Sequence, residues 1–178
     1  MEEKRIIEDL VKTKGVVETQ EVFSAIQDGV LVMVYPYGIK DGKYTTPRGV
    51  TKIANRAFDG LHLREITIGP DVTEIGVGAF FEEYDLEKVN MGENVAKIGA
   101  YAFSRCSCLT SIELPKGLKE IGEHAFDECV QLPNMTLPET IETIGKDAFR
   151  RTPIEKDVYR QFEEIKKERD AEKGVAKK

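Results

Sequence analysis

The chain has 178 residues, of which 33% are charged and 40% are hydrophobic, and its formal net charge at pH 7 is −6. This length suits about one domain, and the composition is that of a globular protein rather than a disordered or collagen-like chain. Residues 49–154 hold 11 basic and 17 acidic side chains, so an acidic middle argues against nucleic acid as a partner. No run approaches the ~20 apolar residues of a membrane span, so we expect no membrane insertion.

The first 48 residues are predicted to form a cap. Apolar residues at helical spacing within residues 2–12 predict a short amphipathic helix over residues 1–15. Within residues 16–48, Asp28-Gly29 separates two β-rich runs, which is typical of a type I′ hairpin. No basic segment followed by an apolar core is present, so we expect either a cytoplasmic chain or one whose signal peptide has been removed. Three cysteines, an odd number, favour a reduced protein.

Residues 49–154 are predicted to form a solenoid, because they repeat. Five segments share the pattern aliphatic-x-x-Ile-x-x-x-Ala-Phe, beginning at Val50 in the first copy and at Ile141 in the last. The phenylalanines of this pattern, spaced 22, 23, 23 and 23 residues apart, are Phe58, Phe80, Phe103, Phe126 and Phe149. A fixed period in the twenties is typical of stacked coils, each of which buries its apolar side chains against the next.

A second repeated piece ends in aliphatic-x-aliphatic, the period of a β-strand. Its four copies, each followed by Gly or Pro, occupy residues 63–68, 86–91, 109–114 and 132–137. We therefore expect one strand per coil from this piece and a short extended segment around the Ile that precedes Gly. Coils at a strand spacing of ~4.8 Å would stack these side chains in rings, giving a mainly β solenoid.

The combined repeat resembles the BspA-like, or treponemal-type, leucine-rich repeat. Residues 109–132 match its pattern Leu-x-x-Ile-x-Leu-Pro-x-x-Leu-x-x-Ile-Gly-x-x-Ala-Phe-x-x-Cys-x-x-Leu almost position for position. The cysteine position of the pattern holds Leu61, Glu83, Cys106, Cys129 and Thr152, and the first coil is one residue short. The resemblance implies a right-handed array of about five coils. It also implies a bacterial adhesion or interaction protein, because BspA-like proteins are typically secreted or on the cell surface of host-associated bacteria.

Residues 155–178 are predicted to form a capping helix and a frayed tail. Thr152 to Glu155 has the pattern of a capping box, with Pro153 at the first helical position. An apolar stripe at helical spacing follows, consisting of Ile154, Val158, Phe162 and Ile165. We expect this stripe to dock on the last coil; the alternative is a helix that binds a partner.

No motif predicts catalysis, a metal or a cofactor. The sequence lacks a phosphate-binding loop and the usual metal-ligand spacings. Cys129 occupies an inward position of the repeat, and nothing in the sequence orients His124 as its base. The pair Glu82-Glu83 is predicted to lie in a solvated turn. Cys106 and Cys129 hold equivalent positions in adjacent coils, which predicts either a ladder of buried thiols or a redox-formed disulfide.

Two surfaces are candidates for ligand binding. The first is the outward face of the four predicted strands, which carries Glu65, Thr67, Lys88, Asn90, Ser111, Glu113, Asn134 and Thr136. The second is a turn in which Phe81 and Tyr84 replace polar residues of the other coils, although both could also pack over the preceding loop.

These observations favour a non-enzymatic protein- or peptide-binding module, with adhesion or host interaction as the role that the resemblance suggests. The alternative is an intracellular structural protein that self-associates through the ends of its solenoid.

Overall fold

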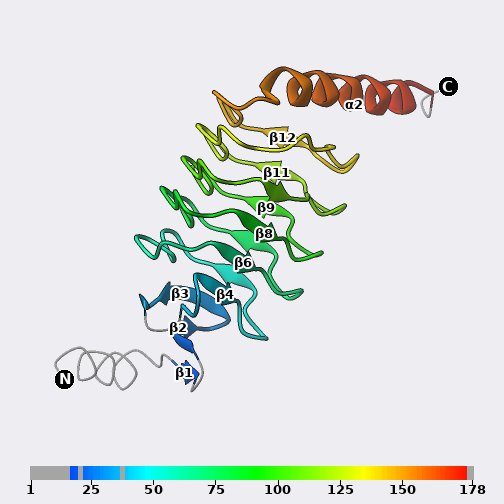
Figure 1. The fold of residues 1–178 in the computed structure, drawn as a ribbon. Coiled ribbons are helices and arrows are strands. Elements are labelled where there is room, and N and C mark those ends of the chain that lie inside the picture. Colours follow the sequence, from blue (N-terminus) through cyan, green and yellow to red (C-terminus); the bar gives the residue numbers. More distant parts are fainter. Residues whose placement is uncertain (1–16, 20–21, 37–38, 176–178) are drawn as a thin grey trace.

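The computed structural model describes residues 17–19, 22–36 and 39–175, and it shows a stack of coils that ends in a helix (Figure 1). It is a mainly β solenoid of about five coils, as the periodicity predicts. The helix predicted over residues 1–15 and the last residues of the tail lie outside the described residues.

Two sheets line the solenoid. The larger sheet has eight strands in the order β1 (Val17–Thr19), β2 (Val22–Gln27), β3 (Val30–Val34), β5 (Lys52–Ile53), β7 (Glu74–Ile75), β9 (Lys97–Ile98), β11 (Glu120–Ile121) and β12 (Thr143–Ile144). The smaller sheet has four strands, β4 (Lys43–Thr45), β6 (Glu65–Thr67), β8 (Lys88–Asn90) and β10 (Ser111–Ile112). From β5 onward every neighbouring pair in the larger sheet is parallel, because each coil repeats the direction of the one before it.

The core is a column of phenylalanine rings inside the coils. Phe58, Phe80, Phe103, Phe126 and Phe149 are all 0% exposed. Successive ring centroids lie 4.5, 5.0, 5.3 and 5.2 Å apart, with near-parallel planes. These distances follow from the spacing of paired strands. The predicted repeat register is therefore confirmed.

Close packing of the coils requires glycine after the inward isoleucine. A Cβ added to Gly122 would lie 2.4 Å from the backbone nitrogen of Ala100, and one added to Gly145 would lie 2.3 Å from that of Glu123. No other residue fits these positions without a shift of the backbone. The Ile-Gly pair of the repeat thus couples a buried side chain to a close backbone approach.

A hairpin covers the N-terminal end, as predicted. Asp28 and Gly29 join β2 to β3 with φ angles of 50° and 76°, the left-handed pair that a type I′ turn requires. β3 then pairs in parallel with β5, so the hairpin continues the larger sheet. β4 pairs in parallel with β6 and continues the smaller sheet in the same way.

Helix α2 (Glu155–Val175) covers the C-terminal end. Ile154 and Val158 are 2% and 0% exposed, and Phe162 and Ile165 pack against the core, so the predicted stripe docks on the last coil. The predicted capping box is wrong. The helix begins at Glu155, after the proline, and the hydroxyl of Thr152 donates to the carbonyl of Phe149 (2.7 Å).

Candidate functional site

The polar side chains of the smaller sheet bind one another. Glu65 lies at the centre, with its Oε2 atom 2.9 Å from Nζ of Lys43 and its Oε1 atom 3.3 Å from Nζ of Lys88. Nδ2 of Asn90 donates to Oε1 of Glu65 (2.9 Å) and lies 3.1 Å from Oγ1 of Thr67. Hydrogen bonds from Lys43, Asn90 and Lys88 lower the pKa of Glu65 to about 2. This part of the strand face is therefore already paired within the chain.

The predicted fourth strand, residues 132–137, is absent from the sheet, whose first member is β4 instead. Backbone N–H groups of Arg64, Glu87 and Thr110 each donate to the preceding coil. Pro133 occupies the next position of that column and has no N–H to donate. Consequently Asn134 and Thr136 are exposed but do not extend the strand face as predicted. Ser111 lies on β10, and Glu113 lies just beyond its end.

Helix α2 replaces the missing strand partner. Oε1 of Gln161 accepts a hydrogen bond from the backbone N–H of Leu137 (2.9 Å), and its Nε2 donates to the carbonyl of Met135 (3.1 Å). Arg169 of the same helix donates to the carbonyls of Glu139 (2.5 Å) and Ile141 (2.8 Å). The helix side chains thus bind backbone groups of the final coils, which an open array would leave at its end.

The two turn aromatics have different environments. Phe81 is half-buried, and the guanidinium carbons of Arg56 and Arg105 both lie 5.8 Å from its ring centroid. Tyr84 is 47% exposed. Phe81 is therefore held between two cations, whereas Tyr84 remains open to a ligand.

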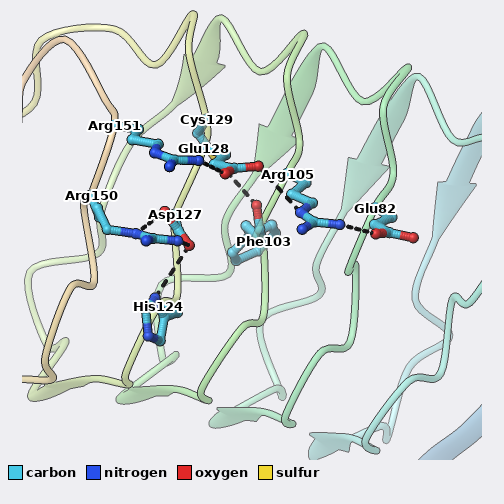
Figure 2. Close-up of polar contacts among 9 residues, drawn as sticks. All are labelled: Glu82, Phe103, Arg105, His124, Asp127, Glu128, Cys129, Arg150 and Arg151. Atoms are coloured by element: carbon cyan, nitrogen blue, oxygen red, sulfur yellow. Dashed lines mark hydrogen bonds and ion pairs between the residues drawn. The ribbon is translucent and has the colours of Figure 1, made fainter.

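A column of alternating charge crosses the same turns (Figure 2). Nη1 of Arg105 lies 2.5 Å from Oε1 of Glu82, and its Nε lies 3.2 Å from Oε2 of Glu128. Glu128 also pairs with Arg151 in the last coil. Sequence reasoning missed this column, although its four members are spaced 23 residues apart and alternate in sign.

The column borders a hollow of about 470 Å³, which we call the turn recess. It is lined by Tyr84, Arg105, Ser107, Glu128, Val130 and Arg151. Tyr84, Ser107 and Val130 hold equivalent positions in three successive coils, and Val130 is 53% exposed. The small Ser107 between two larger apolar side chains creates the depression. Of the predicted site residues, Tyr84 alone belongs to it.

His124 is oriented by a carboxylate, contrary to the sequence-based expectation (Figure 2). Its Nδ1 lies 3.2 Å from Oδ2 of Asp127, whose two oxygens accept hydrogen bonds from Arg150 at 2.9 and 2.6 Å. Burial acts to raise the pKa of Asp127, but Arg150 and His124 outweigh it and lower that pKa. The ring of His124 also stacks on Tyr101 at 4.9 Å. These contacts join three coils.

The cysteines form the predicted ladder of buried thiols. Cys106 and Cys129 are both free and 0% exposed. Their Sγ atoms lie 3.2 and 3.0 Å from the carbonyl oxygens of Phe80 and Phe103 in the preceding coils. Burial raises the pKa of Cys106 well above its usual value and raises that of Cys129 to about 12. Neither thiol is therefore an activated nucleophile.

Glu83 is buried, so its predicted place in a solvated turn is wrong. It is 1% exposed, and its two carboxylate oxygens accept hydrogen bonds from the backbone N–H groups of Leu61 (3.0 Å) and Leu63 (2.7 Å). Burial raises the pKa of Glu83, although these two hydrogen bonds act to lower it. Glu82, by contrast, is partly exposed and pairs with Arg105. The buried carboxylate compensates the short first coil and holds no position for chemistry.

A groove of about 540 Å³ crosses the larger sheet. Its lining includes Lys52, Glu74, Lys97 and Glu120 on one side and Gly99, Gly122 and Gly145 along the floor. Lys52 pairs with Glu74 at 3.0 Å, and Lys97 pairs with Glu120 at 3.1 Å. The charges of this groove are thus paired within the chain.

Among the described residues, no three His, Cys, Asp or Glu side chains are grouped to hold a metal ion. Within the same part of the chain, the single long helix is too polar to cross a membrane.

Solved structures of bacterial leucine-rich repeat proteins share this fold. A leucine-rich repeat protein of T. pallidum is 25% identical with a TM-score of 0.67, over 76% of this chain and 66% of that one. A leucine-rich cell surface protein of Faecalibacterium prausnitzii is 24% identical with a TM-score of 0.57, over 77% and 46% of the two chains. A leucine-rich repeat protein of Bacteroides ovatus is 29% identical with a TM-score of 0.56, over 75% and 35%. The chain thus spans two thirds or less of the length of each of these proteins.

The search of curated proteins found no match. The family model for the BspA type leucine rich repeat region matches residues 39–159 in six copies, which is more than half of the chain. The chain belongs to the BspA-type leucine-rich repeat family.

Proposed function

We propose that this chain is a non-enzymatic protein- or peptide-binding module and that it binds through the turn recess. The carrying observation is the exposure of Tyr84 and Val130, 47% and 53%, on both sides of a hollow. Apolar side chains that flank a depression with a polar rim are typical of interaction sites. Extended repeat arrays also present such surfaces to partner proteins. Adhesion or host interaction, which the family resemblance suggests, is part of this proposal.

The strand face is the weaker candidate. Its carboxylate Glu65 already accepts hydrogen bonds from Asn90 and two lysines. A ligand that binds these groups has to replace existing bonds, so it gains little free energy from each new contact. Tyr84 and Val130 require no such exchange, because burying their exposed surface is favourable by itself.

End-to-end self-association is also less well supported. Helix α2 covers the last coil, with Val158 0% exposed. Gln161 binds the backbone of the segment that would otherwise offer an unpaired strand to a second copy. Pairing through this end would require the helix to leave.

The test compares partner capture by three forms of the protein. Biotinylated wild type, Tyr84→Ser/Val130→Ser and Lys88→Glu/Glu113→Lys are incubated with host-surface and bacterial extracts, and recovered proteins are identified by mass spectrometry. We expect a partner that binds the wild type and the strand-face variant with similar affinity and is lost from the recess variant. Loss from the strand-face variant alone would move the site to the smaller sheet. Recovery of no protein above a blank surface would contradict the binding function.

A further inference from the structure

The turn recess lacks one member of an outer column of side chains. Inside the solenoid, the rings of Phe80 and Phe103 stack 5.0 Å apart because the coils impose that interval. Outside, Tyr84 and Val130 lie two coils apart, with the small Ser107 between them. A ring or a branched aliphatic chain placed over Ser107 would meet both neighbours at about the interval that stacks the core. The recess therefore has the width of one apolar side chain.

The rim of the recess carries a cation with a single carboxylate partner. Arg105 lies between Glu82 and Glu128 and pairs with both. Arg151 ends the charged column, pairs with Glu128 through Nη1, and has a side chain that is 64% exposed. Two arginines and one glutamate line the recess, so this part of the surface is positive although the chain carries a net charge of −6.

We propose that the turn recess binds an extended segment of a partner protein that carries a large apolar side chain and, two or three residues further on, an Asp or Glu. The apolar side chain lies over Ser107, and the carboxylate binds Arg151. These two residues are two coils apart, roughly 9–10 Å, which an extended segment covers in about three residues. This inference rests on the proposed function and specifies the chemistry of the partner.

The experiment selects peptides on the protein itself. A display library of random linear seven-residue peptides is selected on the wild type, and the enriched peptides are synthesised and measured by fluorescence anisotropy. We expect enrichment of Phe, Tyr, Trp or Leu followed by Asp or Glu at the second or third position. Arg151→Gln should weaken binding roughly two- to fivefold and abolish the preference for the acidic residue, as loss of an exposed ion pair predicts.

Two matched substitutions locate the site. Ser107→Tyr fills the recess with the residue that the preceding coil already carries at Tyr84, so the repeat accommodates it. Ser111→Tyr makes the same change in the same coil on the strand face, where Ser111 is exposed. We expect Ser107→Tyr to weaken the selected peptides at least about tenfold, the loss of one buried apolar contact, and Ser111→Tyr to have no effect.

Each other outcome overturns part of the reasoning. Peptides that lack the apolar–acidic pattern, or that bind Ser107→Tyr as well as the wild type, refute the inference and leave the binding function in place at another surface. Failure to enrich any peptide also refutes it, because the recess should accept a single linear segment. The binding function itself fails separately, if the capture experiment recovers no partner.

Discussion

Replacing Glu83 should destabilise the protein more than replacing any other glutamate of the turns. The Glu83→Ala variant leaves the buried N–H groups of Leu61 and Leu63 without the carboxylate that accepts their hydrogen bonds. An unsatisfied buried polar group costs about 1–3 kcal/mol, so the expected loss in the free energy of unfolding is about 2–6 kcal/mol. A typical domain has a stability of about 5–15 kcal/mol, so this loss is large.

The repeat consensus makes the opposite forecast, which sharpens the test. Cysteine is the consensus residue at this position, and Cys106 and Cys129 occupy it in the next two coils. The thiol of Cys106, however, bonds to the carbonyl of Phe80 and leaves the amides of the preceding coil untouched. We therefore expect Glu83→Cys to be about as unstable as Glu83→Ala. Glu82→Ala, which removes the neighbouring surface carboxylate, should cost less than about 1 kcal/mol.

The stability of these variants should also differ in its dependence on pH. Burial raises the pKa of Glu83, so the folded state binds this proton more tightly than the unfolded state does. The contribution of Glu83 is therefore most favourable below its unfolded pKa of about 4.3 and falls as pH rises through the higher folded pKa. Glu83→Gln removes this proton and should remove the corresponding slope.

Urea unfolding followed by circular dichroism at pH 4.5, 6 and 8 measures all four variants. The reasoning is refuted if Glu83→Cys is as stable as the wild type, because consensus packing would then matter more than the two hydrogen bonds. It is equally refuted if Glu83→Ala and Glu82→Ala unfold at the same urea concentration.

Three further predictions test the core, the thiols and the C-terminal cap. Phe103→Ala removes a ring stacked on both sides and should cost about 3–5 kcal/mol in urea unfolding; a loss below about 1 kcal/mol would contradict the stacked core. In a thiol titration of the folded protein, the half-buried Cys108 should react first, and Cys106 and Cys129 only on unfolding; simultaneous reaction of all three would contradict the buried ladder. Gln161→Ala should cost about 1–3 kcal/mol and speed hydrogen exchange of the last-coil amide that it binds; unchanged exchange would show that the side chain is dispensable.

The sequence predicts the solenoid because its strongest signals are local and repeated. Phe103 and its equivalents recur at one spacing, and Asp28-Gly29 has few other uses between two β-rich runs. The missing strand at residues 132–137 could also have been predicted. Pro133 stands where the earlier coils need a backbone donor, and the aliphatic alternation around it hides this loss.

The candidate site is less predictable, because it depends on which columns of side chains meet. The sequence shows that Tyr84 is unusual in its turn, but Val130 forms the recess with it only through a coil that carries Ser107 between them. The burial of Glu83 likewise depends on two amides 20 and 22 residues earlier. Contacts of this kind become visible only when every coil is aligned on the same register.

That register is itself supported by charge. Opposite signs recur between neighbouring coils along several columns, as in Lys52–Glu74, Lys97–Glu120 and the column from Glu82 to Arg151. Each exposed pair contributes at most about 1 kcal/mol to stability. A slip by one whole coil would nevertheless keep the apolar rings matched while placing Glu82 against Glu128 and Glu74 against Glu120. Because the apolar pattern is nearly identical in every coil, it cannot distinguish these arrangements. The alternating charges can, and this specificity explains why a mostly polar surface is so regularly paired.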